Sequence, residues 1–156
     1  MVASGSGRIR SRWQIGSGRL SGEVDARWEA KGGMISGFLG DQTVLHEIRR
    51  DEAGWRLNGA RVEGLEQLVD LDYDFTPATN VLQLSRLALK PGQCAEVPVV
   101  WFDLDRASLT ELPQRYERRS ASSCWYEAPT VPYRALLEIA PNGFVQSYPG
   151  LWRLVA

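Results

Sequence analysis

The sequence has few of the side chains that nucleophilic catalysis and metal binding use. It contains one histidine, His46, and two cysteines, Cys94 and Cys124, among 156 residues. A Ser–His–Asp or Cys–His catalytic group would have to use His46, and the Gly-x-Ser-x-Gly pattern of a nucleophile elbow is absent. We therefore expect His46 to be an ordinary strand residue, and no spacing supports a metal site built on the cysteines.

Excess charge of either sign and long hydrophobic runs are also missing. The chain has 18 Lys and Arg against 19 Asp and Glu, so its formal net charge is -1. Without a basic field to attract phosphates, nucleic-acid binding is not expected. No segment approaches the ~20 apolar residues of a transmembrane helix, and the first fifteen residues lack the apolar stretch of a secretory signal. We therefore expect a cytoplasmic protein with reduced thiols, although one bridge between the two cysteines stays open.

Hydrophobic periodicity and turn residues predict an all-β fold. Asn-Gly pairs at 58–59 and 142–143 predict tight hairpins, because both turn positions need a positive φ. About nine or ten short strands joined by hairpins give a mainly antiparallel sheet. Such a sheet must curl into a barrel or roll, or split into a sandwich, to protect its edges. The segments with strand patterns are 20–30, 34–39, 43–50, 55–57, 60–62, 68–75, 97–104, 114–127, 133–139 and 144–152.

The length fits one domain. We expect residues 1–10 to be a flexible N-terminal tail and residues 11–156 to form a single domain. Alternation of apolar and polar residues is clearest over 20–30, and Gly32-Gly33 is expected to break that strand.

Helix is expected in one or two short segments at most. Over 81–89, Leu84 and Leu87 have helical spacing, but the segment also alternates, so helix and strand both remain open. Residues 108–112 are expected to form one helical turn before Pro113.

An acidic run alternates along the predicted strand 68–75. Asp70, Asp72 and Asp74 fall on one face, and apolar side chains fall on the other. The leading interpretation is a solvated polar face. Three carboxylates could also serve a hard cation, but the run lacks the glycine and distal glutamate of a calcium loop. Ligand binding or structural hydrogen bonding is the third alternative.

Aromatic side chains are well represented, with six Trp, five Tyr and four Phe against one His. Core packing is one explanation, because each aromatic side chain buries ~150–250 Å². The other is a cavity with aromatic walls and a few polar groups at its mouth. The aromatic residues considered for such a cavity are Trp101, Phe102, Trp125, Tyr126, Tyr148 and Trp152.

Two arginines fit the polar part of such a cavity. Arg86 and Arg115 could hold a phosphate or carboxylate bidentately, and a hydroxyl-rich headgroup less specifically. The alternative is an internal ion pair with Asp70, Asp72 or Asp74.

Three sequence blocks, in this order, resemble a known family. Together they resemble the bacterial family described as "Putative glycolipid-binding", over about residues 23–152. Ala78, Gln83 and Ser85 depart from the family pattern, which often has Phe, Pro and Arg there. The matching blocks are Asp70-Leu71-Asp72 with Thr76-Pro77, Thr79-Asn80, Leu82, Arg86 and Leu87; then Gln114-Arg115-Tyr116; then Tyr148-Pro149-Gly150.

The resemblance implies both a fold and a site. The fold would be a spiral β-roll, similar to the half-barrel of periplasmic lipoprotein carriers, with a concave apolar face able to hold acyl chains. The ligand-binding residues predicted on this basis are Trp101, Phe102 and Tyr148 in the apolar wall, Arg86 and Arg115 near the headgroup, Thr79 and Asn80 at the opening, and also Tyr116.

The sequence therefore predicts non-catalytic binding of a lipid-like or glycolipid-like amphiphile by a monomer or homodimer, without cofactor or metal. Each buried CH₂ of an acyl chain would contribute ~0.8 kcal/mol. Two alternatives remain. A small hydrolase or lyase would need two carboxylates converging on a cavity. A purely structural or interaction domain would have a filled interior, without a pocket of ~300 Å³.

Overall fold

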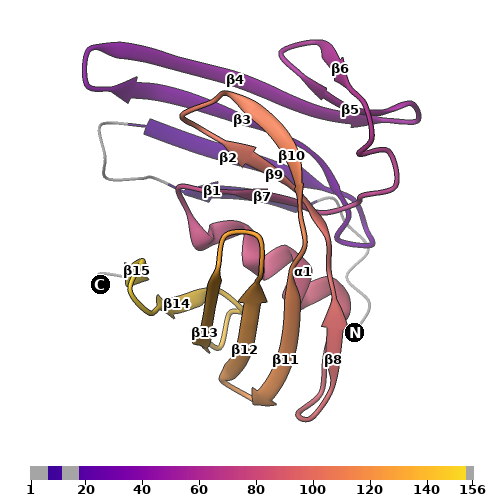
Figure 1. The fold of residues 1–156 in the computed structure, drawn as a ribbon, viewed down its shortest axis with the longest axis vertical. Coiled ribbons are helices and arrows are strands. Elements are labelled where there is room, and N and C mark those ends of the chain that lie inside the picture. Colours follow the sequence, from indigo (N-terminus) through magenta and orange to yellow (C-terminus); the bar gives the residue numbers. More distant parts are fainter. Residues whose placement is uncertain (1–6, 12–17, 154–156) are drawn as a thin grey trace.

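The first six strands form one antiparallel sheet in chain order, in the upper half of Figure 1. The computed structural model describes residues 7–11 and 18–153. β1 overlaps the expected tail at residues 7–10, residues 1–6 lie outside the described residues, and the domain boundaries stay a prediction. The strands are β1 (Gly7–Ser11), β2 (Gly18–Val24), β3 (Ala30–Leu39), β4 (Gln42–Asp51), β5 (Gly54–Leu57) and β6 (Ala60–Val62).

A turn between β2 and β3 corrects the predicted strand 20–30. Asp25 builds this turn, because its Oδ1 accepts hydrogen bonds from the backbone N–H groups of Arg27 and Glu29 at 2.9 and 3.1 Å. The alternating pattern continues through the turn, so periodicity alone does not reveal it. Gly32 and Gly33, expected to break the strand, instead lie inside β3.

Both Asn-Gly pairs lie in hairpin turns, but only the pair at 58–59 has the positive φ that was predicted at both positions. Asn58 and Gly59 have φ values of 51° and 82° between β5 and β6, as a two-residue turn requires. Gly143 has φ 87° in the turn between β13 (Tyr133–Ile139) and β14 (Val145–Tyr148).

A small central sheet contains β7 (Leu71–Tyr73), β9 (Val99–Asp103) and β10 (Ser108–Leu112), in the order β10-β9-β7. The expected helical turn at 108–112 is wrong, because this segment pairs with β9 as an antiparallel strand. β7 pairs with β9 in parallel, with Asp72 beside Trp101 and Tyr73 beside Phe102.

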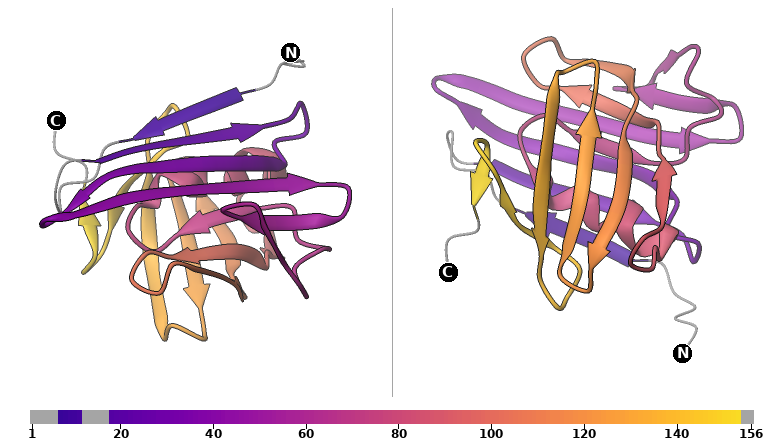
Figure 2. Two further views of the ribbon diagram at one scale, coloured as in Figure 1. Left: turned by 90° about the horizontal axis from the view of Figure 1, so that it is seen from above. Right: turned by 60° about the horizontal axis from the view of Figure 1, so that its bottom comes forward.

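The third sheet contains the C-terminal strands. In Figure 2 its strands cross those of the first sheet. Its order is β15-β14-β13-β12-β11-β8, with all neighbours antiparallel. The strands not yet given are β8 (Cys94–Glu96), β11 (Arg115–Ser120), β12 (Ser123–Ala128) and β15 (Trp152–Arg153).

A long bent hairpin connects the second and third sheets. On the third-sheet side of the bend Glu96 pairs with Arg115, and on the central-sheet side Val99 pairs with Leu112. The same register places Pro98 opposite Pro113. Because proline has no N–H to donate, the ladder is interrupted there and the two strands change sheets together.

A short helical segment lies between the first and third sheets (Figure 1). A 3₁₀ turn, η1 (Pro77–Thr79), leads into α1 (Asn80–Leu87). The ambiguous segment 81–89 is thus mainly helix, which ends at Ala88 with a left-handed backbone. Its apolar side chains pack on both sides: buried Val81 and Leu82 with Val24, and partly buried Leu84 and Leu87 with the third sheet.

Two main hydrophobic cores lie on opposite faces of the central sheet. Val100 and Phe102 of β9 belong to the core under the first sheet, and Val99 and Trp101 belong to the core under the third. β9 is therefore covered on both faces. The all-β, mainly antiparallel fold with one short α-helix is confirmed, as curled sheets that stay open over the part the structure describes.

Candidate functional site

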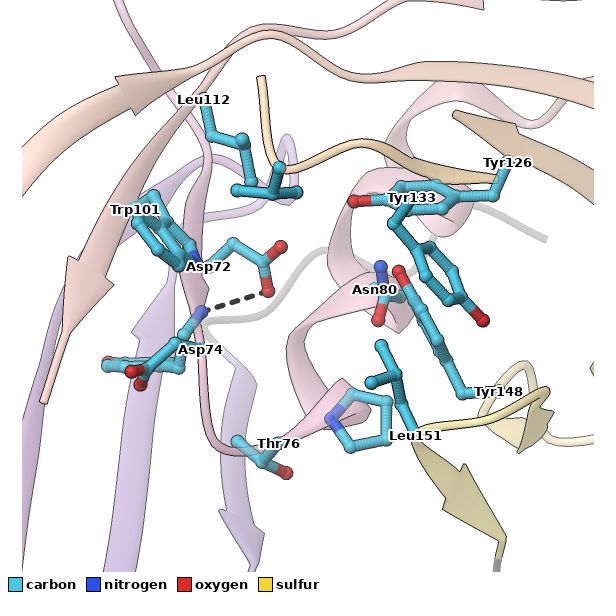
Figure 3. Close-up of a pocket in the computed structure, with 13 residues that line it drawn as sticks. Asp72, Asp74, Thr76, Asn80, Trp101, Leu112, Tyr126, Tyr133, Tyr148 and Leu151 are labelled. Carbon is cyan, nitrogen blue, oxygen red and sulfur yellow. Dashed lines mark hydrogen bonds between the residues drawn. The ribbon is translucent and has the colours of Figure 1, made fainter. Parts of the chain in front are cut away.

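A pocket of about 270 Å³ lies between β7, η1 and the third sheet. Figure 3 shows Trp101 on one side of it and Tyr126, Tyr133 and Tyr148 on the other. The residues that line it are Asp72, Tyr73, Asp74, Thr76, Pro77, Asn80, Trp101, Leu112, Tyr126, Val131, Tyr133, Tyr148 and Leu151.

Asp72 forms a buried anionic wall of the pocket. Its Oδ1 accepts hydrogen bonds from the Thr79 hydroxyl at 2.6 Å and from the Tyr73 N–H at 2.9 Å. Its Oδ2 accepts one from Gln114 Nε2 at 2.7 Å. Burial raises the pKa of Asp72, and the hydrogen bonds from Thr79 and Gln114 oppose that rise. Both carboxyl oxygens of Asp72 therefore have hydrogen-bond donors, and none of the described residues forms an ion pair with it.

A chain of polar side chains continues from Asp72 behind the pocket. Asn80 Nδ2 donates to the Tyr116 hydroxyl at 2.7 Å, and that hydroxyl donates to Gln114 Oε1 at 3.3 Å. The network joins β7, α1 and β11, so it fixes the pocket's polar wall from three elements. Thr79, Asn80 and Tyr116 all take part, with Asn80 alone of these three lining the cavity.

The opposite wall is a cluster of tyrosines. The Tyr133 and Tyr148 rings stack at 5.1 Å between centroids, and Tyr126 meets Tyr148 edge-on at 5.4 Å. The Tyr133 hydroxyl donates to the Pro149 carbonyl at 2.6 Å. Burial raises the pKa of the Tyr126 and Tyr148 phenols, so both stay protonated and able to donate at neutral pH.

Asp74 lies at the exposed margin of the pocket. Its Oδ2 accepts a hydrogen bond from the Leu104 N–H at 3.2 Å. Partial burial raises the pKa of Asp74 to about 6, and the nearby negative charges of Asp103 and Asp105 add to the rise. Its charge therefore changes near neutral pH.

The sequence-predicted site residues do not all meet at this pocket. Asn80, Trp101 and Tyr148 line it. Phe102 points the other way, into the core under the first sheet, because neighbouring residues of a strand face opposite sides.

The two predicted arginines are both engaged outside the pocket. Arg86 forms a bidentate ion pair with Asp70, the alternative left open by the sequence. Arg115 lies on β11 next to inward-facing Tyr116, and so on the outer face of the third sheet. Its partners there are Glu96, Glu117 and Glu127.

The solvated face predicted for the acidic run is wrong for two of its members. Asp70 and Asp72 are only 1% and 6% exposed, because α1 and the bent hairpin cover that face. Structural hydrogen bonding, the third alternative, describes both. Among the residues that the structure describes, no group of three or more His, Cys, Asp and Glu side chains is arranged to hold a metal ion.

The remaining polar candidates have ordinary structural surroundings. His46 lies against Phe102, with ring centroids 5.2 Å apart, and its Nδ1 is 3.1 Å from Asn58 Nδ2. Cys94 and Cys124 are free thiols. β11 lies between their strands, so they are two strand spacings apart, or about 9.5 Å, beyond the ~7 Å limit for a disulfide.

Sequence reasoning missed much of the pocket. Tyr126 was considered only among the aromatic residues in general, and Tyr133 was not a candidate. Their alternation within 123–128 and 133–139 marks them as inward-facing, but only the register across the third sheet brings them beside Tyr148. The side chain of Trp152 lies outside the described part of the chain.

The fold and the pocket define a class of all-β proteins in which open, curled sheets hold a small pocket with aromatic walls. The chain belongs to the family described as "Putative glycolipid-binding", whose sequence profile matches residues 13–154. This confirms the resemblance seen in the three sequence blocks.

A solved structure has the same fold. A DUF1089 family protein from Pseudomonas aeruginosa is 22% identical, with a TM-score of 0.76, over 97% of this chain and 93% of that chain. No curated protein matches the sequence. In the described part of the chain, no helix is long and apolar enough to cross a membrane.

Proposed function

We propose that the pocket binds the headgroup of a glycolipid-like amphiphile without changing it chemically. The observation that carries this proposal is the placement of Asp72 and Asn80 between Trp101 and the tyrosine wall. Sugar rings present apolar C–H faces that pack on aromatic rings, and hydroxyl groups that donate to carboxylate and amide oxygens. The family description supports the same ligand class.

The size of the pocket suits a headgroup rather than a whole amphiphile. Its volume of about 270 Å³ lies just below the ~300–1,000 Å³ that is usual for pockets of drug-sized ligands. Two apolar side chains at its margin, Val131 and Leu151, are 39% and 59% exposed. An alkyl chain leaving the pocket would lie across them, and each CH₂ withdrawn from water would contribute about 0.8 kcal/mol.

Hydrolysis by a carboxylate pair is the competing function, since Asp72 and Asp74 both line the pocket. Glycoside hydrolysis needs two carboxylates on opposite sides of the bond that breaks. Asp72 lies on β7 and Asp74 follows it directly, so both belong to the same wall (Figure 3). Three donors also occupy the Asp72 oxygens. This arrangement supports binding over catalysis.

Native mass spectrometry tests the proposal. The protein is purified without detergent, extracted with organic solvent, and incubated with a total lipid extract of the expression host. We expect an added mass that extraction removes and incubation restores. Trp101→Ala should abolish it, because this change removes one wall of the pocket.

Trp125→Ala is the matched control. Trp125 lies next to Tyr126 on β12 but on the opposite face, with its Nε1 donating to Glu127 at 2.8 Å. This variant should keep the added mass. A wild-type protein that stays free of added mass after incubation would contradict the proposal and favour the structural-domain alternative.

A further inference from the structure

The charged groups of the pocket are all of one sign. Of the described residues that line it, Asp72 and Asp74 carry charge, and none is Arg, Lys or His. The elements around the cavity otherwise present aromatic, aliphatic, amide and hydroxyl side chains. We infer that the pocket is selective by charge: it accepts neutral or cationic headgroups and rejects phosphate, sulfate and carboxylate. This inference deepens the proposed function and rests on it.

The Asp72 carboxyl accepts three hydrogen bonds, which favour its charged form, and no cation among the described residues neutralises that charge. Its hydrogen-bond donors are a hydroxyl, an amide and a backbone N–H, which are all uncharged. Such donors stabilise a carboxylate without cancelling its field. Because the side chain is only 6% exposed, solvent screens that field weakly, and an anion in the pocket would meet like charge in a low dielectric.

Asp74 adds negative potential at the entrance. Asp103 and Asp105 lie near it. Arg106, the cation of that turn, pairs with Asp103 at 3.2 Å rather than with Asp74. An approaching anion is therefore repelled before it reaches Asp72.

The arginines that could have compensated this charge are committed elsewhere. Arg86 is bound to Asp70, and Arg115 to glutamates on the outer face of the third sheet. An anionic headgroup would thus find no cationic partner among the described lining residues, whereas a hydroxyl or ammonium group could donate to Asp72, Asp74 or Asn80. Aromatic walls also favour cations over anions, because ring faces carry negative potential.

Calorimetric titration with three amphiphiles of equal chain length tests the inference. The probes are octyl β-glucoside, octylammonium and octyl sulfate, used as monomers at neutral pH and fixed ionic strength. We expect the glucoside and the ammonium to bind, and the sulfate to bind at least tenfold more weakly. Added salt should bring the affinity for the sulfate closer to the other two, because it screens the negative charge at the pocket entrance.

Two charge-removing variants provide the internal comparison. Asp74→Asn should reduce the ratio of the glucoside affinity to the sulfate affinity several-fold. Glu63→Gln removes one charge from an exposed position after β6, outside the pocket lining. This variant should leave the ratio of the two affinities unchanged. Circular dichroism checks that both variants are folded.

The outcomes separate the inference from the function beneath it. If octyl sulfate binds as tightly as the glucoside, charge selectivity is overturned while amphiphile binding stands. If Glu63→Gln reduces the ratio of the two affinities as much as Asp74→Asn does, the net charge of the protein rather than the pocket causes the selectivity, and the inference fails. If none of the probes binds, the proposed function and the inference fail together.

Discussion

Two buried tyrosines differ in what surrounds their hydroxyl groups. The Tyr116 hydroxyl accepts a hydrogen bond from Asn80 and donates one to Gln114. The Tyr73 hydroxyl is buried without a hydrogen-bond partner among the described residues. It occupies the space above Gly33 on β3, where the Cβ of any larger residue would overlap it.

This difference predicts opposite effects of the same substitution. Tyr73→Phe should raise the free energy of unfolding by about 1 kcal/mol, because it removes an unsatisfied buried hydroxyl. Tyr116→Phe should lower it by about 1–3 kcal/mol, because Asn80 and Gln114 lose a shared partner. Urea unfolding of both variants measures the two values. A loss of stability in Tyr73→Phe would show that its hydroxyl has a partner after all.

At single positions, the sequence predicted which kinds of side chain form the site better than it predicted where each of them lies. Asn80, Trp101 and Tyr148 were candidates and line the pocket, but Phe102 lies one residue from Trp101 and belongs to the other core. Which member of an adjacent aromatic pair faces a site depends on which sheet covers each face. No residue near the pair in sequence carries that information.

At the scale of elements, an ion pair joins α1 to Asp70, the residue before β7, and Gln83 Nε2 of α1 donates to the Leu71 carbonyl of β7 at 3.3 Å. Arg86 Nε donates to Asp70 Oδ1 at 3.2 Å, and its Nη2 donates to Oδ2. Asp70 is 1% exposed, so its charge depends on this partner. The backbone carbonyl of Asp70 also accepts from the Val100 N–H at 2.9 Å, which ties the same residue to β9.

Arg86→Leu should therefore destabilise the protein by about 3–5 kcal/mol, because it leaves a buried carboxylate unpaired. The matched change Arg115→Leu should cost much less, since solvent screens the ion pairs of Arg115 with its partly exposed glutamate partners. Denaturant unfolding compares the two. Adding Asp70→Asn to Arg86→Leu should recover part of the loss, and equal costs for the two arginine variants would contradict this account.

Elements with a local signal were predictable, and elements set by distant pairing were not. The Asn-Gly hairpins follow from turn chemistry. In contrast, the segment 108–112 is a strand because β9 lies beside it, and β7 is buried on both faces because of partners further along the chain. The helix at α1 was one of two patterns that its residues fit equally well.

For the whole molecule, carboxyl groups with raised and lowered pKa values act on stability in opposite directions. Burial raises the pKa of Asp74 to about 6, against 3.8 for an unperturbed carboxyl. The hydrogen bond from Arg56 lowers the pKa of Asp51. Between about pH 4 and pH 6, folded Asp74 keeps a proton that the unfolded chain releases, so rising pH favours unfolding at this group. Above that window its contribution is constant.

Asp74→Asn should remove the part of the pH dependence of stability that comes from Asp74. The stability of the variant relative to the wild type should increase as pH rises from about 4 to about 7, with most of the change below about pH 6. The introduced amide keeps an oxygen that can accept from the Leu104 N–H, so the fold is retained. Thermal unfolding across this pH range gives the difference curve, in which groups common to both proteins cancel. A flat curve would mean that Asp74 titrates normally.

Successive side chains of β9 face two different cores, so a change at the pocket can alter an NMR signal in the other core. Trp101 forms a wall of the pocket, and the next residue, Phe102, is in contact with the imidazole of His46 on the first sheet. The chain has a single histidine, so its ring protons give one uncrowded set of NMR signals. A shift of β9 when the pocket fills would alter the ring current of Phe102 at that imidazole. Occupancy of the pocket can thus be followed from the far side of the molecule, without a label.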